Sequence, residues 1–205
     1  MDPHFSKYAA FFGRAPDFVR PPGPDGSPQV SVGRFPPKPV GSFRRLFTPV
    51  SKLWVHITWG MSAKPMRVSN EGGDKHAERI ELLAYSMNPP VGVQVGQDMI
   101  SAVLQVLATI PFAAGIFFAP GFTAQFDEPF CSNSEMRAFL FTEPAGVAVS
   151  RLCSCTPGAQ VVLSVTPITV SERDYAAKHG PRPLIELFIK NGVKNFFDPF
   201  RKTVV

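Results

Sequence analysis

The chain contains few charged residues and few cysteines for its length. Charged residues make up 18% of the 205 residues, and the three cysteines are Cys131, Cys153 and Cys155. Three thiols cannot complete a disulfide framework, and cysteines two positions apart rarely pair because the geometry is strained. We therefore expect reduced thiols and a cytoplasmic protein.

The usual sequence signatures of enzymes are missing. The sequence has no GxSxG motif, no glycine-rich phosphate loop, no HExxH motif and no dinucleotide-binding fingerprint. One alternative stays open, a small cytosolic enzyme or metal-binding protein that uses His56 with Cys153 and Cys155. Histidine catalysis needs a nucleophile or an acid within hydrogen-bonding reach, and a lone Cys-x-Cys lacks the spacing of a zinc module. We therefore favour a buried structural histidine and expect neither a metal nor a cofactor.

Charge is absent from residues 99–126, a run long enough to cross a bilayer. Two features argue against a membrane span. Pro111 interrupts the helical pattern, and the polar residues Ser101, Gln105 and Thr109 fall on one helical face. We therefore predict a buried helix over residues 98–110, ended or bent at Pro111 and followed by core strands.

Proline and phenylalanine are abundant, with 22 and 19 residues, which favours a turn-rich fold with an aromatic core over a helical bundle. Residues 1–50 contain seven basic and three acidic residues, and this difference accounts for four of the five net positive charges. The stretch shows no sustained helical or strand period. We predict a basic N-terminal arm (residues 1–50), partly packed on the domain or on a partner, and a domain over residues 51–205. The basic residues are dispersed and form no nucleic-acid-binding module, so no nucleic-acid partner is expected.

Regular patterns begin near residue 53. Alternating aromatic and β-branched residues predict strands over residues 54–62, 79–86, 116–118, 122–126, 137–141 and 161–168. In the helix over residues 98–110, Asp98 is a candidate N-cap. Its predicted apolar stripe consists of Met99, Val103, Val106, Leu107 and Ile110.

The last third of the chain has the clearest helix signals. Ser171 with Asp174 three residues later approximates a capping box, and Gly180 ends the short helix that follows. Pro183 opens a second helix, which ends near Gly192. Together the patterns predict an α+β fold, in which helices pack on a mixed, largely antiparallel β-sheet.

Taken in order, these segments resemble the suppressor of fused family from about residue 54 to residue 192. The matching segments are residues 56–62 (HITWGMS), 80–82 (IEL), 132–135 (SNSE), 142–144 (TEP) and 184–187 (LIEL), together with Glu172 and Gly180. The first segment departs from the family pattern, because one variable position between His56 and Ile57 is missing. The resemblance implies a protein that binds other proteins and performs no known chemistry.

The resemblance to single-domain bacterial members implies, more specifically, an immunity protein that neutralises a cognate bacterial toxin by binding it directly. We place the contact at residues 70–78 and at the edge of the strand over residues 79–86, where a partner strand could pair with the main chain. Asp74, Glu78 and Glu81 would select a basic ligand there. Glu81, like Glu172 and Glu186, matches a family position, and acids at strand and helix ends more often cap or pair. The sequence leaves open which toxin is bound and whether the protein is oligomeric.

Overall fold

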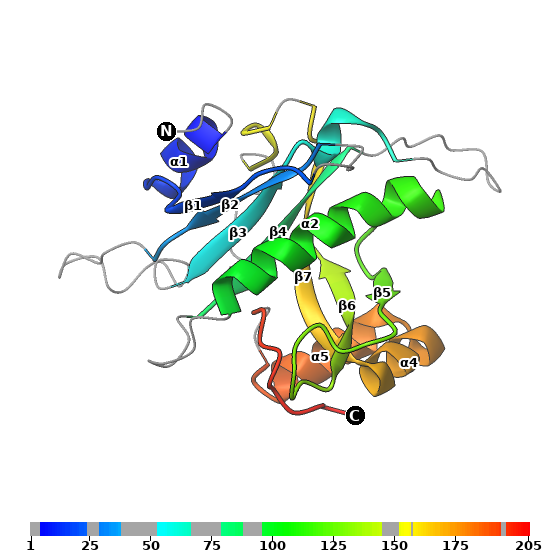
Figure 1. Ribbon diagram of the computed structural model, residues 1–205. Coiled ribbons are helices and arrows are strands. Elements are labelled where there is room, and N and C mark those ends of the chain that lie inside the picture. Colours follow the sequence, from blue (N-terminus) through cyan, green and yellow to red (C-terminus); the bar gives the residue numbers. More distant parts are fainter. Residues whose placement is uncertain are drawn as a thin grey trace.

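The computed structural model describes residues 5–23, 29–37, 53–66, 79–87, 96–144, 152–156, 158–193 and 196–205, with the backbone alone for residues 96–98. The described residues form a seven-stranded sheet in the order β1-β2-β3-β4-β7-β6-β5, with helices on both faces (Figure 1). Neighbouring strands are antiparallel except for β4 and β7, the parallel pair near the centre. The predicted α+β fold with a mixed, largely antiparallel sheet is confirmed.

The strands are β1 (Phe18–Arg20), β2 (Ser31–Phe35), β3 (Trp54–Trp59), β4 (Ile80–Ser86), β5 (Thr123–Gln125), β6 (Met136–Thr142) and β7 (Val161–Thr169). The helices are α1 (Ser6–Phe12), the 3-10 helix η3 (Met61–Ala63), α2 (Gly96–Ala114), α4 (Val170–His179) and α5 (Pro181–Lys190).

Part of the N-terminal arm belongs to this sheet, although we predicted no regular element before residue 53. β2 pairs with β3 along its whole length, from Ser31 opposite Trp59 to Phe35 opposite Val55. α1 packs on the same sheet through Phe5, which precedes it, and Tyr8, both of which are fully buried. β1 and β2 are short, and Gly33 interrupts the alternation of β2, so their sequences lack a strand signal of their own. The domain boundary at residue 50 stays a prediction.

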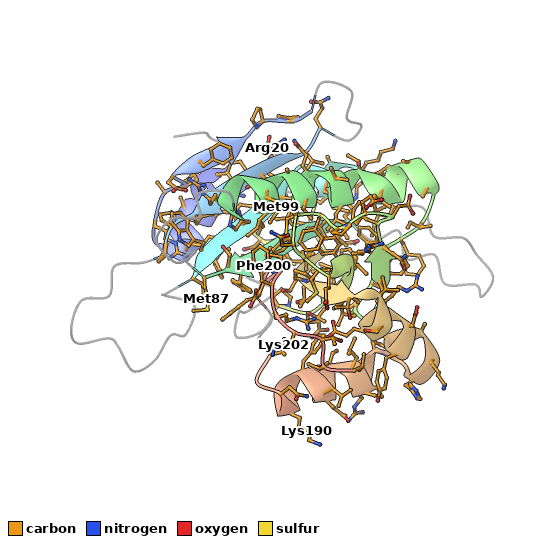
Figure 2. The ribbon with its side chains drawn as sticks, turned by 60° about the horizontal axis from the view of Figure 1, so that its bottom comes forward. Arg20, Met87, Met99, Lys190, Phe200 and Lys202 are labelled. Atoms are coloured by element: carbon orange, nitrogen blue, oxygen red, sulfur yellow. The ribbon has the colours of Figure 1, made fainter. Side chains whose placement is uncertain are left out.

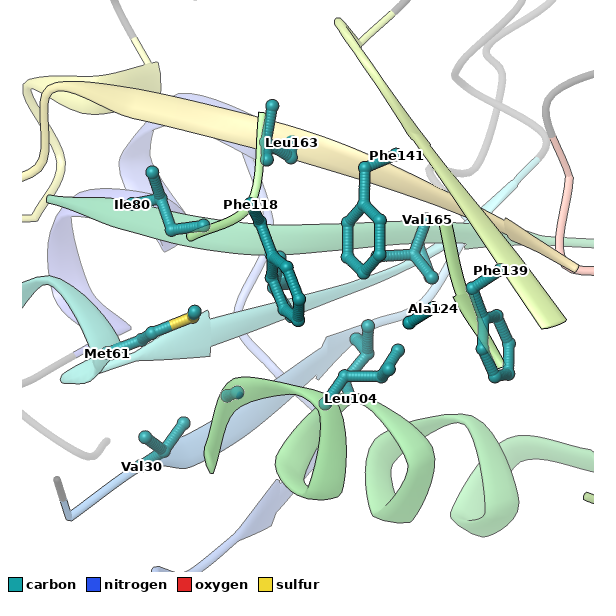
Figure 3. Close-up of a cluster of buried hydrophobic side chains, with 14 of the residues drawn as sticks. Val30, Met61, Ile80, Leu104, Phe118, Ala124, Phe139, Phe141, Leu163 and Val165 are labelled. Atoms are coloured by element: carbon teal, nitrogen blue, oxygen red, sulfur yellow. The ribbon is translucent and has the colours of Figure 1, made fainter. Parts of the chain in front are cut away.

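α2 covers one face of the sheet and forms the largest apolar cluster with it (Figure 3). Leu104 of α2 packs over side chains from the central strands, including Leu163 and Val165 of β7. Phe118, from the segment after α2, stacks on Phe141 of β6, with 4.2 Å between ring centroids. Because this face is closed over by a helix, strand residues that point toward α2 must be apolar or hydrogen-bonded internally.

The helix prediction for α2 was correct in type and wrong at both ends. The helix begins at Gly96, so Asp98 lies inside its first turn and is not the N-cap. Pro111 lies inside the last turn, and the helix continues to Ala114. Gly115 follows in the left-handed conformation, with φ of 67°, and this conformation ends the helix. Pro111 has no backbone N–H, so the helix lacks one hydrogen bond at this position. The proline ring is buried.

The buried face of α2 matches the predicted stripe in part. Leu107 is buried, and Met99, Val103 and Ile110 are partly buried against the same cluster. The fully or almost fully buried apolar residues of the helix are Ile100, Leu104, Leu107 and Ala108, whereas Val106 is 50% exposed. Both stripes have helical spacing, and nearly every residue of the helix is apolar or small. Periodicity therefore could not choose between the two faces, and packing against the sheet decided it.

The opposite face of the sheet carries two further apolar clusters. One surrounds α1 and includes Val55 and Ile57 of β3 together with Cys153 and Cys155. The other lies under α4 and α5, where Leu184 and Phe188 pack on Ala138 and Leu140 of β6. Both faces of the central strands are thus covered, which explains why every residue of β4 is buried.

Three smaller predictions were wrong. Residues 116–118 are not a strand, and α5 begins at Pro181 instead of Pro183. The capping box of α4 consists of Thr169 and Glu172, two residues before the predicted pair Ser171 and Asp174. Thr169 ends β7, so the strand itself supplies the cap.

The uncharged run of the sequence forms α2 and the segment after it. Among the helices in the described part of the chain, none combines the length and the apolar character needed to cross a membrane.

Phe5 tests whether the arm is part of the folded domain. Its ring lies against Gly33 and contacts the rings of Tyr8, Phe35 and Trp59. We expect Phe5→Ala to lower the free energy of unfolding by about 3–5 kcal/mol, because the change leaves a cavity between α1 and the sheet. Urea denaturation measures this loss, with the exposed Phe200→Ala as the matched control. A Phe5→Ala loss no larger than that of the control would contradict the packing of the arm.

Candidate functional site

Glu81 lies on β4, in the middle of the sheet, and its side chain is completely buried. Its Oε1 accepts hydrogen bonds from the backbone N–H of Gly60 at 3.1 Å, the N–H of Ser62 at 3.1 Å and the hydroxyl of Ser62 at 2.7 Å. Its Oε2 accepts one from the Thr58 hydroxyl at 2.6 Å. The carboxylate therefore joins β4 to the end of β3 and to η3.

The turn around this carboxylate depends on Gly60. Gly60 has φ of 102°, and a Cβ at this position would lie 2.4 Å from the carbonyl oxygen of Gln29. Only glycine fits both the torsion and the close approach. The Trp-Gly-Met-Ser segment thus holds two N–H groups and a hydroxyl toward Glu81.

Burial raises the pKa of Glu81, while the hydrogen bonds from Thr58, Ser62 and Gly60 act in the opposite direction. This residue was predicted to contact a partner, at an exposed strand edge over residues 79–86. That prediction was wrong, because β4 has β3 on one side and β7 on the other. Asp74 and Glu78 lie outside the described residues, so their contact with a partner stays a prediction.

His56 is a buried structural residue of β3 that faces α2. Its Nδ1 lies 3.2 Å from the Ser101 hydroxyl of α2, and its Nε2 lies 3.3 Å from the Ser86 hydroxyl of β4. Burial, assisted by the charge of Arg34, lowers the pKa of His56 to about 3. The neutral ring has a hydroxyl partner for each nitrogen, which agrees with the favoured interpretation of this residue.

Cys153 and Cys155 lie on the other side of the sheet from His56. They share an apolar cluster with Val55 and Ile57, whose side chains alternate with His56 along β3. Their thiols donate to the carbonyl oxygens of Gln160 and Lys7, respectively. Burial raises the pKa of Cys153, which disfavours a reactive thiolate. The sheet therefore separates His56 from Cys153 and Cys155, the residues with which it would form an enzyme or metal site.

No group of three or more histidine, cysteine, aspartate or glutamate side chains within the described ranges has the arrangement of a metal site. The described residues thus bring together neither a His56–cysteine pair nor a metal-ligand set.

Glu172 is a second fully buried acid, at the start of α4. Arg201 holds it through two hydrogen bonds of 2.6 Å, one to each carboxylate oxygen. The N–H groups of Thr169 and Val204 donate to the same carboxylate, each at 3.0 Å. The pair fixes the C-terminal segment (residues 196–205) against the junction of β7 and α4. By contrast, Glu186 is exposed and pairs with Arg182 one turn away.

Arg201, Thr58 and Ser62 were not predicted from the sequence as partners of these acids. Thr58 and Ser62 lie in the motif that matches the family, but their role depends on the approach of β4, which is about twenty residues away in the sequence. Arg201 is twenty-nine residues from Glu172 and has no sequence motif around it.

The comparisons with known proteins point to one family. The family model described as "Suppressor of fused protein (SUFU)" matches residues 40–202. No curated protein matches the sequence.

Three solved structures have a similar fold. A suppressor of fused homologue from Neisseria gonorrhoeae has a TM-score of 0.66 and 17% identity, and the match covers 98% of this chain and 94% of the other. A structure of the Sufu–Fu complex has a TM-score of 0.57 and 12% identity, covering 85% of this chain and 76% of the other. Drosophila Suppressor of Fused has a TM-score of 0.56 and 14% identity, covering 85% of this chain and 42% of the other.

Replacement of Glu81 tests its role as the internal cap of the turn. We expect Glu81→Ala to lower the free energy of unfolding by at least about 3 kcal/mol, because it leaves several buried donors without an acceptor. Glu81→Gln retains one oxygen for the three donors of Gly60 and Ser62 and should lose less than half as much. Urea denaturation of both variants checks this, and equal losses would contradict the hydrogen-bond network.

His56 predicts a pH dependence with a definite sign. Its pKa is about 3 in the folded chain against 6.5 for the unperturbed group, so the unfolded state binds the proton first as pH falls. Stability due to this group is complete above pH 6.5 and is lost toward pH 3. Between pH 6.5 and pH 5 we expect wild type to lose about 2 kcal/mol more than His56→Gln, by denaturation at both pH values. Parallel losses in the two proteins would refute this assignment.

Proposed function

The chain belongs to the suppressor of fused family, and we propose that it works by binding another protein, without catalysing a reaction. The family match covers most of the chain. One of the similar structures is a Sufu complex with the protein Fu. Protein binding is therefore a property of a structural relative, and we infer the same general role for this chain.

The observation that supports this proposal is that the polar motif residues form hydrogen bonds inside the fold. Glu81, Glu172 and His56 are each buried and hydrogen-bonded within the fold. A catalytic group must reach a substrate, and none of these three can do so without disrupting the fold. The motif residues thus support a rigid scaffold, and a scaffold of this kind acts through its surface.

The finer proposal is that the partner is a cognate toxin and that the chain is an immunity protein of a toxin–antitoxin pair. The similarity to the Neisseria gonorrhoeae homologue over nearly the whole of both chains supports a role like that of single-domain bacterial members. Inhibition would follow from covering the active or substrate-binding surface of the toxin. This mechanism requires tight binding and no chemistry from the immunity protein.

Co-purification and growth rescue test the proposal together. We expect the tagged full chain to capture one protein in a stoichiometric complex that re-forms from purified components. Co-expression should then restore growth to cells that produce the partner, because the bound partner is inactive. Glu81→Ala, which destabilises the scaffold, should capture less of the partner and is the negative control. If the purified components fail to form a complex, the protein-binding proposal is refuted. If they bind but co-expression does not restore growth, only the immunity role is refuted.

A double charge reversal tests whether Asp74 and Glu78 contact the partner. We expect Asp74→Lys with Glu78→Lys to weaken the complex at least about tenfold if residues 70–78 contact a basic region of the partner. Calorimetric titration with the purified partner measures the change. Unchanged affinity would show that residues 70–78 do not contact the partner. The partner would then have to bind elsewhere on the surface of the scaffold.

A further inference from the structure

We propose that four buried hydroxyl groups, on the face of the sheet away from α2, bind water inside the fold. They belong to one residue of β4, one of β6 and two of β7, here called the hydroxyl cluster: Tyr85, Thr142, Ser164 and Thr166. The bound water connects β4 with β7 and β6 at the level where β4 and β7 stop pairing. Because this site is internal, it goes beyond the proposed function and can be tested without the partner.

The strand register places the four hydroxyl residues together. Ser164 is opposite Thr142 in the β6–β7 pair and beside Leu83 in the β4–β7 pair. Thr166 and Tyr85 follow Ser164 and Leu83 by two residues, so their side chains project from the same face. The hydroxyl cluster therefore spans three neighbouring strands.

The residues around the hydroxyl cluster identify its face of the sheet. Leu163 and Val165, which alternate with the hydroxyl residues of β7, belong to the apolar cluster under α2 (Figure 3). On the other face, Val162 belongs to the apolar cluster around α1, and Ile168 belongs to the one under α4 and α5. The hydroxyls lie between these two apolar clusters.

The hydroxyl cluster is buried, yet the described chain leaves it unbonded. Its side chains range in exposure from 0% for Ser164 to 7% for Thr142. Six buried side-chain nitrogen and oxygen atoms have no hydrogen-bond partner among the described residues, and four of them are these hydroxyl oxygens, so the unbonded groups concentrate at one place. Leaving a buried hydroxyl unbonded costs its lost hydration. Summed over four groups, this cost is comparable with the net stability of a small domain, so we expect a partner that the polypeptide does not supply.

The position of the hydroxyl cluster in the sheet gives the water a role. The paired residues of β4 and β7 end at Leu83 and Ser164, and Tyr85 and Thr166 are the next residues on the same face. Beyond the paired residues, no ladder hydrogen bonds join the two described strands. A water molecule bonded to the hydroxyls of Tyr85 and Thr166 links the strands at this level.

The C-terminal segment bonds to both strands near this level, but through their main chains. The N–H of Phe197 donates to the carbonyl oxygen of Tyr85 at 2.6 Å, and Arg201 donates to the carbonyl oxygen of Pro167 at 2.9 Å. Figure 2 shows Phe200 of this segment near the end of β4. These bonds use carbonyl oxygens and leave the side-chain hydroxyls for another partner.

The chemistry of the hydroxyl cluster selects a small, neutral partner that both donates and accepts hydrogen bonds. Each hydroxyl can donate one hydrogen bond and accept others. Burial raises the pKa of Tyr85, so its hydroxyl keeps its proton. Arg201, which bonds next to Thr166, has its charge paired with Glu172. Water meets these requirements, and at about three hydrogen bonds per internal water, about one or two molecules satisfy the four hydroxyls.

Isosteric variants test this assignment by the sign of their effect. If the hydroxyls are bonded to water, Thr166→Val and Tyr85→Phe each remove a hydrogen bond, and we expect the urea midpoint to fall. If the hydroxyls are unbonded, the same changes remove a buried polar group without a partner, and the midpoint should rise. Val165→Thr is the matched control, because it adds a hydroxyl at an equally buried position of β7 inside an apolar cluster and should lower the midpoint.

The water itself can be counted and located. Magnetic relaxation dispersion of the water oxygen reports long-lived internal waters. We expect Thr166→Val with Ser164→Ala to reduce the dispersion amplitude of the wild type, and Val165→Thr to leave it unchanged. A crystal structure of the wild-type chain should show ordered water within hydrogen-bonding distance of at least two of the four hydroxyls.

Water binding at this site is refuted if the midpoints of Thr166→Val and Tyr85→Phe rise. It is also refuted if the crystal structure shows the hydroxyls bonded to other groups of the polypeptide or to a larger bound molecule. Should a variant fail to fold, the wild-type crystal structure decides by itself. Capture of a partner by the wild type is a separate measurement, so the proposed function stands or falls independently of this site.

Discussion

The arrangement of the central sheet depends on the buried carboxylate of Glu81. It accepts four hydrogen bonds from the end of β3 and from η3, and it does so from the middle of a strand that is buried on every residue. A charged group in such a place is costly unless its oxygens are fully bonded, so the turn after β3 must supply donors in the right positions. Gly60 allows the backbone to do this, and the register of β3 against β4 follows from it.

Glu172, the second buried acid, has the same function at the other end of the parallel strands β4 and β7. β4 pairs with β7 only as far as Leu83 opposite Ser164. Beyond this point the C-terminal segment bonds to both strands, through Phe197 to Tyr85 and through Arg201 to Pro167. Glu172 holds Arg201 in place and caps α4 at the same time. The ends of the two parallel strands are therefore closed by the Glu172–Arg201 ion pair and by hydrogen bonds.

The parts of the fold that could be predicted are those with a strong local signal. β3, β4, β6, β7, α2, α4 and α5 were all expected from periodicity, capping residues and turn residues, and the match to the family followed from their order. The parts that were missed depend on distant contacts. β2 becomes a strand because β3 offers it an edge, and β1 because β2 offers it the next edge. The inward face of α2 is chosen by the sheet. Pro111 was predicted to end or bend the helix, but a proline in the last turn removes only one hydrogen bond there.

The sequence by itself determined the α+β class, the family and the conclusion that its polar motif residues more often cap or pair than catalyse. It did so because hydrophobic period, capping residues and glycine positions act over a few residues. Only the tertiary structure decided that Glu81 is central and inaccessible, that Arg201 pairs with Glu172, and that His56 and the cysteines lie on opposite faces of the sheet. Burial and ion pairing between residues far apart in sequence depend on which strands become neighbours, and no local pattern specifies that choice.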